Sequence, residues 1–285
     1  MLENDRSQST LPLAHGELSE GDAAELTALK NQIHVAVGLN CELYKEKCLR
    51  RRLAVRMRAL GAHTYSEYAR LLRSDEPEYQ RLLDIVTINV SKFFRNPEVW
   101  DVVREQVLPG LFATPAARLN LWSAGCASGE EPYTLSMLFQ EYAETHDHRI
   151  DHLRVLGTDI DREVLAAAVR AQYPPFAMTD MSRDTIARWF EPGDGNTLKP
   201  EARRNVKFAQ LDLIKDEFPA KQHMICCRNV IIYFERSLQE DLFERFHQSL
   251  LPGGILVLGK VEAMFGKAAS MFRPISNRQR VFRRI

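Results

Sequence analysis

A segment with two glycines contains the first residues that could bind a ligand. An apolar run over 119–122 is followed by Gly125, Gly129, Glu130 and Pro132, and a proline suits the first turn of a helix. Glycines at such a turn let the backbone pass close to a ligand. Glu130 would repel a pyrophosphate but suits a ligand with an ammonium group or free hydroxyls. A tight turn without a ligand is the alternative, because the spacing is not that of a dinucleotide-binding motif.

A second candidate is the acid that ends another apolar run. The run over 154–158 has the length of a buried strand and stops at Asp159. A carboxylate in that place can accept hydrogen bonds from both hydroxyls of a ribose. Helix capping is the alternative, and it suits Asp161 better than Asp159.

A third candidate segment follows the apolar run over 224–227. Arg228 and Asn229 are polar residues at the end of this run, and Tyr233 follows after three more apolar residues. These side chains could contact a ligand at a strand end. Alternatively, Arg228 belongs to a structural ion pair, and Tyr233 is a core aromatic residue whose hydroxyl has a partner.

The elements that must position these residues can be predicted from the hydrophobic pattern. Strands are predicted at 119–122, 154–158, 206–209, 224–227 and 255–258, and helices at 97–112, 131–145, 162–171 and 236–250. This alternation predicts an α/β fold with a parallel sheet covered by helices. In such a sheet a ligand binds at the carboxyl ends of the strands.

The rest of the chain has other patterns. Apolar residues fall at helical spacing between about 22 and 83, where Thr64 and Glu67 form a capping-box pattern, so a small all-helical module is expected. Prolines and glycines break the alternation over 173–205, which predicts an inserted subdomain with a helix and a short hairpin. The end of the chain, 279–285, is predicted to be an antiparallel edge strand.

Composition narrows the classes of protein. The 285 residues are 45% hydrophobic, so the chain should fold. The 38 Lys and Arg residues balance the 38 Asp and Glu residues, so the chain has no net positive charge that would attract nucleic acid. The sequence contains neither a membrane-spanning run nor a secretory signal, which predicts a cytoplasmic protein without membrane insertion. No metal site is expected, because no C-x-x-C pair occurs and the histidines lie in a polar loop, at His146, His148 and His152.

Four motifs in order give a resemblance to a known family. They lie at 87–95, 122–133, 158–161 and 227–234, and a Leu-Pro-Gly-Gly turn leads into the apolar run that ends at Gly259. Their order resembles the class I S-adenosylmethionine-dependent methyltransferases with a Rossmann-like sheet. More narrowly, over about residues 25–270, the chain is similar to the chemotaxis receptor methyltransferases of the CheR type.

The resemblance implies a domain organisation. An all-helical N-terminal domain precedes a linker and a methyltransferase domain that carries a small inserted β-subdomain. The expected bounds are a disordered lead-in at 1–20, the helical domain at 21–86, the linker at 87–96, the methyltransferase domain at 97–285 and the insertion at 173–205.

The resemblance also implies the cofactor and its site. S-adenosylmethionine is the methyl donor and S-adenosylhomocysteine the product. Besides Gly125, the implied cofactor-binding residues are Asn89, Ser91, Arg95, Glu130, Asp159, Asp212, Leu213, Arg228 and Asn229. Arg95 and Tyr233 would be the catalytic residues that face the reacting carboxylate.

The implied reaction moves a methyl group onto glutamate side chains in the cytoplasmic helices of methyl-accepting chemotaxis receptors. A glutamate has a pKa of about 4.3 and is ionised at neutral pH, so no general base is needed. This agrees with the lack of a convincing Ser/His/Asp or Cys/His set. The protein is expected to act as a monomer.

A local basic cluster could meet such a receptor. Nine Lys and Arg residues stand between 43 and 73 against Glu46 and Glu67. On one helix they form two stripes, one with Lys45, Arg52 and Arg56 and one with Lys47, Arg51 and Arg58. A solvated helix face is the ordinary interpretation. The resemblance favours a surface that steers acidic receptor helices, with Arg52, Arg56 and Arg58 as the substrate-binding residues.

Departures from the family pattern leave alternatives open. The glycine-containing loop at 192–196 is short, so tethering to a receptor-tail pentapeptide is not expected. Glu262 ends a Gly-Lys-Val-Glu segment in place of Gly-x-Ser-Glu, and Asp212 stands where Asn is common. The alternatives are a methyltransferase for a small molecule or RNA, and a regulatory module that binds S-adenosylhomocysteine without turnover.

Overall fold

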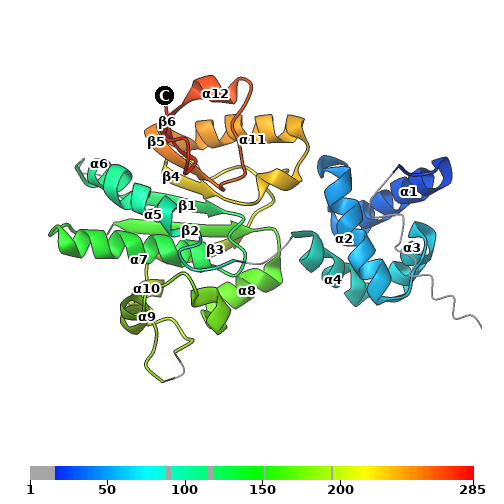
Figure 1. Cartoon of the computed structure of the whole chain (residues 1–285), viewed down its shortest axis with the longest axis horizontal. Coiled ribbons are helices and arrows are strands. Elements are labelled where there is room, and N and C mark those ends of the chain that lie inside the picture. The colour runs from blue at the N-terminus through cyan, green and yellow to red at the C-terminus, as the bar shows by residue number, and fades with distance from the viewer. Residues whose placement is uncertain (1–16, 88–90, 114–117, 151, 194) are drawn as a thin grey trace, which may run out of the picture. The chain divides into compact units, whose positions relative to one another are not determined.

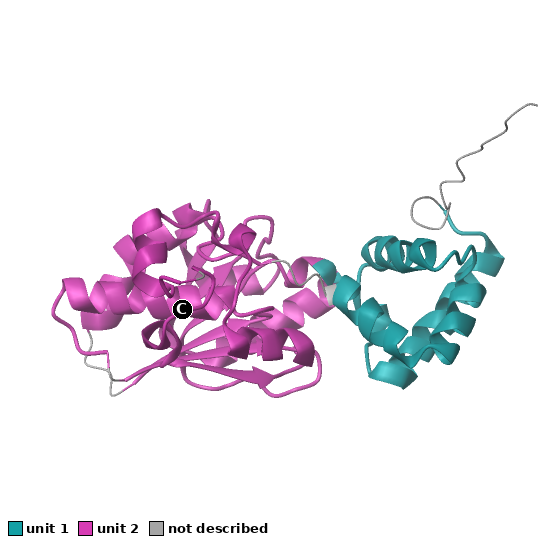
Figure 2. Cartoon of the chain, turned by 90° about the horizontal axis from the view of Figure 1, so that it is seen from below, with its two compact units in different colours: residues 1–88, 233–235 teal, residues 89–232, 236–285 magenta. Residues whose placement is uncertain are grey.

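The computed structural model describes residues 17–87, 91–113, 118–150, 152–193 and 195–285. The chain divides into two compact units, shown in teal and magenta in Figure 2. Unit 1 comprises residues 1–88 with 233–235, and unit 2 comprises 89–232 with 236–285. Most of the predicted lead-in lies outside the described residues, and the first helix begins at Glu20. No helix in the described ranges has the length and apolar character needed to span a bilayer.

Unit 1 is helical, as the periodicity predicts. Its elements are α1 (Glu20–Val37), the 3-10 turn η2 (Cys41–Leu43), α2 (Glu46–Ala59), α3 (Tyr65–Ser74) and α4 (Glu76–Thr87). The predicted capping box is confirmed, because Thr64 accepts from the Glu67 N–H while the Glu67 side chain accepts from the backbone of Thr64. The apolar residues at helical spacing form one core that includes Leu29, Ile33 and Leu53, all with no exposed surface.

Unit 2 contains a seven-stranded sheet in the order β3-β2-β1-β4-β5-β7-β6 (Figure 1). The strands are β1 (Leu119–Ala124), β2 (Leu153–Asp159), β3 (Val206–Gln210), β4 (Gln222–Cys227), β5 (Leu250–Leu258), β6 (Phe272–Ser276) and β7 (Val281–Arg284). The first five pair in parallel, so all five predicted strands and the predicted parallel sheet are confirmed.

The end of the chain differs from its prediction in one respect. Strand β7 is antiparallel to β5, as expected, but it lies between β5 and β6 and is not the edge strand. The edge is β6, whose Pro274 has no N–H to donate to a further strand. That proline interrupts the alternation that would have marked β6 as a strand in the sequence.

The predicted helices of unit 2 are also confirmed. The segment 97–112 is a continuous helical stretch of α5 (Pro97–Val102), the π-helical turn η3 (Val103–Val107) and α6 (Leu108–Ala113). The other long helices are α7 (Glu130–Thr145), α8 (Arg162–Arg170) and α11 (Arg236–Ser249), and shorter ones are η5 (Ile231–Tyr233) and α12 (Ala268–Met271).

The insertion after α8 is largely helical. It contains η4 (Pro175–Met178), α9 (Arg183–Trp189) and α10 (Pro200–Arg203). The predicted helix is present, whereas the predicted hairpin is reduced in the described residues to two isolated antiparallel bridges, Gln172 with Thr197 and Phe190 with Leu198.

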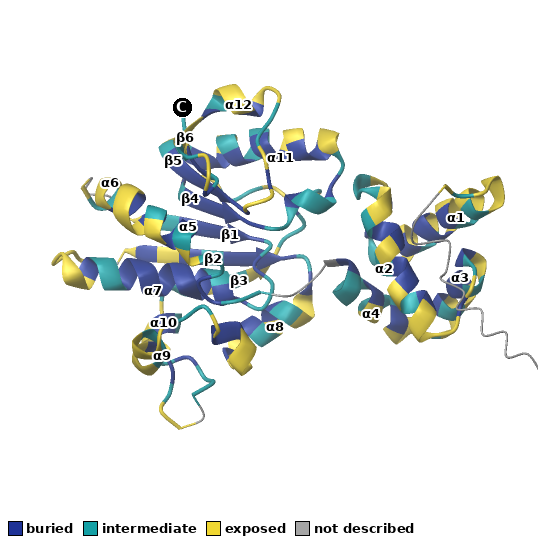
Figure 3. Cartoon of the chain, in the orientation of Figure 1, coloured by how far each residue is buried: buried dark blue, intermediate teal, exposed yellow. Residues whose placement is uncertain are grey.

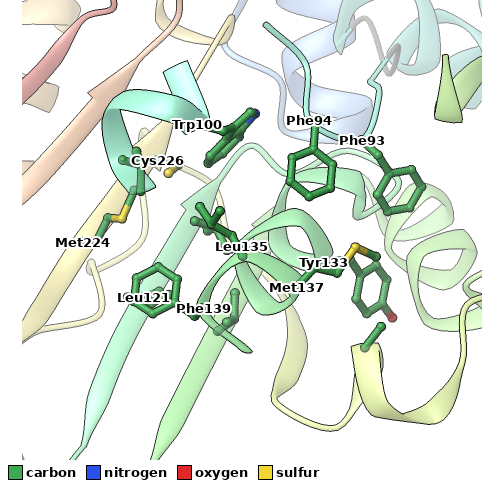
Figure 4. Close-up of a cluster of buried hydrophobic side chains, with 14 of the residues drawn as sticks. Phe93, Phe94, Trp100, Leu121, Tyr133, Leu135, Met137, Phe139, Met224 and Cys226 are labelled. Carbon is green, nitrogen blue, oxygen red and sulfur yellow. The ribbon is translucent and has the colours of Figure 1, made fainter. Parts of the chain in front are cut away.

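The core of unit 2 lies around the central strands and α7, which are mostly dark blue in Figure 3. Phe93, Phe94 and Trp100 enter this core from the segment that precedes and begins α5 (Figure 4). The Phe93 ring packs edge to face on Tyr173 and Phe190, with centroids 4.7 and 5.4 Å away. The segment that carries Arg95 is therefore anchored in the core of unit 2.

Candidate functional site

The predicted site residues of unit 2 follow the carboxyl ends of adjacent parallel strands. Ala124 of β1 pairs with Thr158 of β2, Ser123 pairs with Cys226 of β4, and β2 ends beside Gln210 of β3. The loops that begin at these ends therefore share one edge of the sheet. The order of the strands reverses between β1 and β4, and open α/β sheets bind their ligands at such a switch point.

Glu130 is a buried acid in the first turn of α7. Only 3% of its surface is exposed. The Ser128 hydroxyl lies 2.9 Å from each carboxylate oxygen, and the Ser91 hydroxyl is a further partner. Burial raises the pKa of Glu130, and the hydrogen bonds oppose that shift only in part. A carboxylate held by neutral donors favours a ligand that brings a positive charge or hydroxyl groups.

Asp159 is the second buried acid at this edge. Its Oδ2 accepts from the Ala127 N–H at 2.9 Å and its Oδ1 from the Asp161 N–H at 3.1 Å. Burial raises the pKa of Asp159. Asp161 caps α8 through the N–H groups of Glu163 and Val164, as the sequence predicts. The two acids thus divide their roles, and Asp159 retains acceptor capacity for a ligand.

The two glycines after β1 are required by their neighbours. Gly125 and Gly129 have φ angles of 74° and 93°. A Cβ atom at Gly125 would lie 2.4 Å from Cγ2 of Val230, and one at Gly129 would lie 2.8 Å from Cβ of Ala168. The tight-turn interpretation therefore explains both glycines without a ligand, and a cofactor contact of Gly125 stays a prediction.

Arg228 has the geometry of a structural ion pair. Its Nη1 lies 3.2 Å from Oε2 of Glu131, and its guanidinium lies over the Trp100 ring, 5.1 Å from the centroid. Its Nη2 donates to the Arg95 carbonyl at 2.7 Å and to Oδ1 of Asn96 at 3.0 Å. Of the two interpretations of Arg228, this geometry supports the ion pair, which fixes the backbone that carries Arg95.

The segment around Arg95 holds an unusual backbone. Phe94 and Asn96 have backbone φ angles of 49° and 60°, which residues other than glycine rarely adopt. The Phe94 N–H donates to the Thr134 hydroxyl at 3.1 Å, and the Arg228 bonds hold the next two residues. Strained backbone that its surroundings hold in place is typical of ligand-binding and catalytic sites. Asn89, another predicted cofactor contact, lies outside the described residues.

The loops after β3 and β4 bring the remaining predicted residues. Leu211 donates its N–H to the Asp159 carbonyl at 3.0 Å, which ties the β3 loop to β2. Asp212 uses Oδ1 to accept from the Ile214 N–H at 2.8 Å, and Leu213 is buried. After β4, Asn229 has a φ of 62° and its Oδ1 is a buried acceptor without a partner among the described residues.

Glu262 was missed by the sequence interpretation as a site residue. Its carboxylate accepts from the N–H groups of Asn229, Val230 and Ile231. The available signal was an acid placed four residues after the β5 strand, just past Gly259. Pattern alone does not show that this acid lies under the β4 loop.

Tyr233, the predicted catalytic tyrosine, belongs to unit 1 by its contacts. Its carbonyl accepts from the Lys45 N–H at 2.8 Å. The Arg52 guanidinium lies 5.7 Å from the centroid of the Tyr233 ring, and the side chains of Arg52 and Tyr233 are hydrogen-bonded to each other. Arg52 also donates to the Ile85 carbonyl at 3.1 Å.

The two basic stripes of α2 have different surroundings. Arg56 makes a bidentate ion pair with Glu78, which has no exposed surface, at 2.7 and 2.6 Å. Arg52 and Arg56 therefore have internal partners within unit 1. Lys47, Arg51 and Arg58 are exposed. Of the three predicted substrate-binding residues, only Arg58 is on the open stripe.

The acceptors of unit 2 define the class of ligand that fits. Glu130 and Asp159 are buried carboxylates whose described hydrogen-bond donors are hydroxyl and backbone N–H groups, and Asn229 adds an unpartnered oxygen. These groups suit a molecule with hydroxyls, N–H donors and a positive charge. S-adenosylmethionine has all three features.

Comparisons with known proteins agree with this chemistry. Residues 89–281 match the model described as CheR methyltransferase, SAM binding domain, and residues 24–87 match CheR methyltransferase, all-alpha domain. The chain is 34% identical over 233 residues to a chemotaxis protein methyltransferase of Listeria monocytogenes, which covers 81% of this chain and 87% of that protein. It is 36% identical over 192 residues to chemotaxis protein methyltransferase 1 of Pseudomonas aeruginosa, covering 65% and 70%. The chain therefore belongs to the CheR methyltransferase family and contains that family's S-adenosylmethionine-binding domain.

Proposed function

We propose that the chain is a protein-glutamate O-methyltransferase that methylates the cytoplasmic helices of chemotaxis receptors. The observation that carries the proposal is the pair of buried acids, Glu130 and Asp159, at the switch point of a sheet that matches the family's cofactor-binding domain. The names of the Listeria monocytogenes and Pseudomonas aeruginosa relatives support a role in chemotaxis, since both are named chemotaxis protein methyltransferases.

The residues of unit 2 would hold the cofactor through complementary polarity. Asp159 would accept hydrogen bonds from the ribose hydroxyls of the cofactor. Glu130 would accept from the cofactor's other hydrogen-bond donors, and Ser91 and Ser128 would orient the Glu130 carboxylate. Asn229 would offer its unpartnered oxygen to an N–H donor. The bound cofactor supplies an electrophilic methyl group on a positively charged sulfur.

The protein's task at the substrate is positional. The receptor glutamate is ionised at neutral pH and attacks without a base. Arg95 would orient this carboxylate through paired N–H donors, on a backbone that Arg228 holds. Tyr233 would direct one carboxylate oxygen. Both groups must orient the anion without over-stabilising it, because only stabilisation of the transition state speeds the reaction.

The exposed stripe of α2 is the proposed receptor surface. Lys47, Arg51 and Arg58 present three positive charges on one face, with Val55 between them, 43% exposed. Such a face suits an acidic amphipathic helix and would speed encounter at low salt. In this proposal the protein acts as a monomer. It also acts without binding a receptor-tail pentapeptide, so deleting a receptor's C-terminal tail should leave the rate of methylation unchanged.

Transfer of labelled methyl groups to purified receptor cytoplasmic fragments tests the function. The expected product releases methanol in base, because a glutamyl methyl ester is base-labile. A base-stable product would favour a methyltransferase with another substrate. Binding of S-adenosylhomocysteine with no transfer to any fragment would favour a regulatory module.

A further inference from the structure

The carboxylate of Glu262 connects two loops at the carboxyl edge of the sheet. Oε1 accepts from the N–H groups of Val230 and Ile231 at 3.0 and 3.1 Å. Oε2 accepts from the Asn229 N–H at 3.1 Å and from Gly259. Only 2% of Glu262 is exposed. One side chain therefore satisfies four backbone donors from the β4 and β5 loops.

The arrangement is specific for a carboxylate. Successive N–H groups in a turn that contains a left-handed residue form a concave site for an anion, and Asn229 has a φ of 62°. Burial of the charge costs free energy, and the four N–H donors offset that cost. A Cβ atom at Gly259 would lie 2.8 Å from both the Asn229 nitrogen and Oε2 of Glu262. Glycine at 259 thus leaves the room in which the carboxylate meets the turn.

The turn that Glu262 holds contacts the other loops of the candidate site. The Val230 side chain occupies the space beside Gly125, where a Cβ atom would come within 2.4 Å of it. The loop from Gly125 also carries the Ala127 N–H that binds Asp159. Asn229, in the same turn, carries the unpartnered oxygen. A shift of the turn would therefore reach both Asn229 and the β1 loop.

We propose that Glu262 is a positioning residue of the cofactor site, whose carboxylate fixes the turn 229–231 so that Asn229 and the Gly125 loop stand ready for the cofactor. The inference rests on the cofactor role proposed above for Asn229. Glu262 makes no contact with the cofactor in this scheme and acts through the backbone of the turn.

Glu262→Gln tests the proposal with nearly unchanged volume. An amide replaces one carboxylate oxygen by an NH2 group, so two of the four N–H groups would face a donor. Hydrogen exchange of the cofactor-free protein should accelerate at residues 229–231 and 259. The dissociation constant of S-adenosylhomocysteine, measured by calorimetry, should rise about tenfold or more. Glu262→Asp keeps the charge on a shorter arm and should restore part of both effects.

Two controls separate positioning from a loss of stability. Glu78→Gln removes an equally buried acid of unit 1 and should lower stability without changing the affinity for S-adenosylhomocysteine. Val261→Ala changes a neighbour that is 70% exposed and should change neither readout.

Each outcome decides the proposal. Unchanged exchange at 229–231 in Glu262→Gln overturns it, and so does unchanged affinity beside a lowered melting temperature. If Glu262→Gln fails to fold, the same two readouts on Glu262→Asp decide the question, because both should change in the same direction. A wild-type protein that binds no S-adenosylhomocysteine would sink the proposed cofactor role, while the exchange comparison would still show whether Glu262 holds the turn.

Discussion

Buried acids of the two units are held in opposite ways. In unit 1, Glu78 is paired with Arg56 and accepts from the Tyr68 hydroxyl at 3.0 Å. Burial alone would raise the pKa of Glu78, but these partners leave it below the ordinary value. In unit 2, Glu130 and Asp159 are held by neutral donors, and burial leaves the pKa of each raised.

The difference separates two uses of a buried charge. The charge of a carboxylate paired with an arginine is neutralised inside the protein, so this carboxylate stabilises the fold and offers little to a ligand. A carboxylate held by hydroxyl and N–H groups keeps an uncompensated charge, which a cationic or hydroxyl-bearing ligand can meet. Glu130 and Glu131 show the contrast in adjacent residues, because Glu131 is paired with Arg228.

The largest expected effect concerns the paired acid. Glu78→Gln leaves Arg56 without its carboxylate, so the free energy of unfolding should fall by about 3 kcal/mol. Chemical denaturation measures this loss, and calorimetry with S-adenosylhomocysteine should give wild-type affinity. A variant with wild-type stability would mean that the ion pair does not hold unit 1 together.

The converse effect is expected at the unpaired acid. Asp159→Asn removes a charge that burial disfavours but turns an NH2 group toward the N–H of Ala127 or Asp161, so stability should change little, while affinity for S-adenosylhomocysteine should fall about a hundredfold. Asp161→Asn is the matched control, since asparagine caps a helix about as well as aspartate, and it should leave both the melting temperature and the affinity near wild type. Wild-type binding by Asp159→Asn would contradict the comparison.

The same contrast divides the arginines of α2. Arg58→Glu together with Arg51→Glu should slow methylation of receptor fragments severalfold at low salt, because the exposed stripe loses its attraction for an acidic helix. The affinity for S-adenosylhomocysteine and the melting temperature should not change. Arg56→Glu should instead destabilise unit 1. Equal rates for the double variant and wild type at low ionic strength would count against the receptor surface.

The smallest expected effect is a difference in pH dependence. The pKa of Glu78 is lowered on folding, so its stabilisation is present above the unfolded value near 4.5 and is lost as the pH falls through the folded value. The pKa values of Glu130, Asp159 and Glu262 are raised on folding and have the opposite effect on stability. As the pH falls toward these raised values, the folded protein binds protons more readily than the unfolded chain, so its stability increases.

Hydrogen exchange resolved by unit, between pH about 7 and about 5, measures this difference. After correction for intrinsic exchange, unit 2 should gain protection while unit 1 holds constant. Parallel behaviour of the two units would show that the acids do not differ as described.

Much of the fold could be predicted from the sequence because its signals are local. The capping box at Thr64 and Glu67, the five parallel strands and the long helices each depend on residues within one short window. The candidate acids were found for a related reason, since carboxyl ends of adjacent parallel strands meet at one edge. The edge strand was assigned wrongly because β6 is short and contains Pro274.

The sequence by itself determined the strands, the helices and the placement of Asp159 and Glu130 at the sheet's carboxyl edge, because side-chain periodicity and turn residues encode each element locally. Only the tertiary structure decided which charges are paired. Arg228 meets Glu131 and Arg56 meets Glu78 across 97 and 22 positions of the chain, and Glu262 reaches a turn some 30 residues before it. Such pairings depend on how elements pack, which no short window of sequence records.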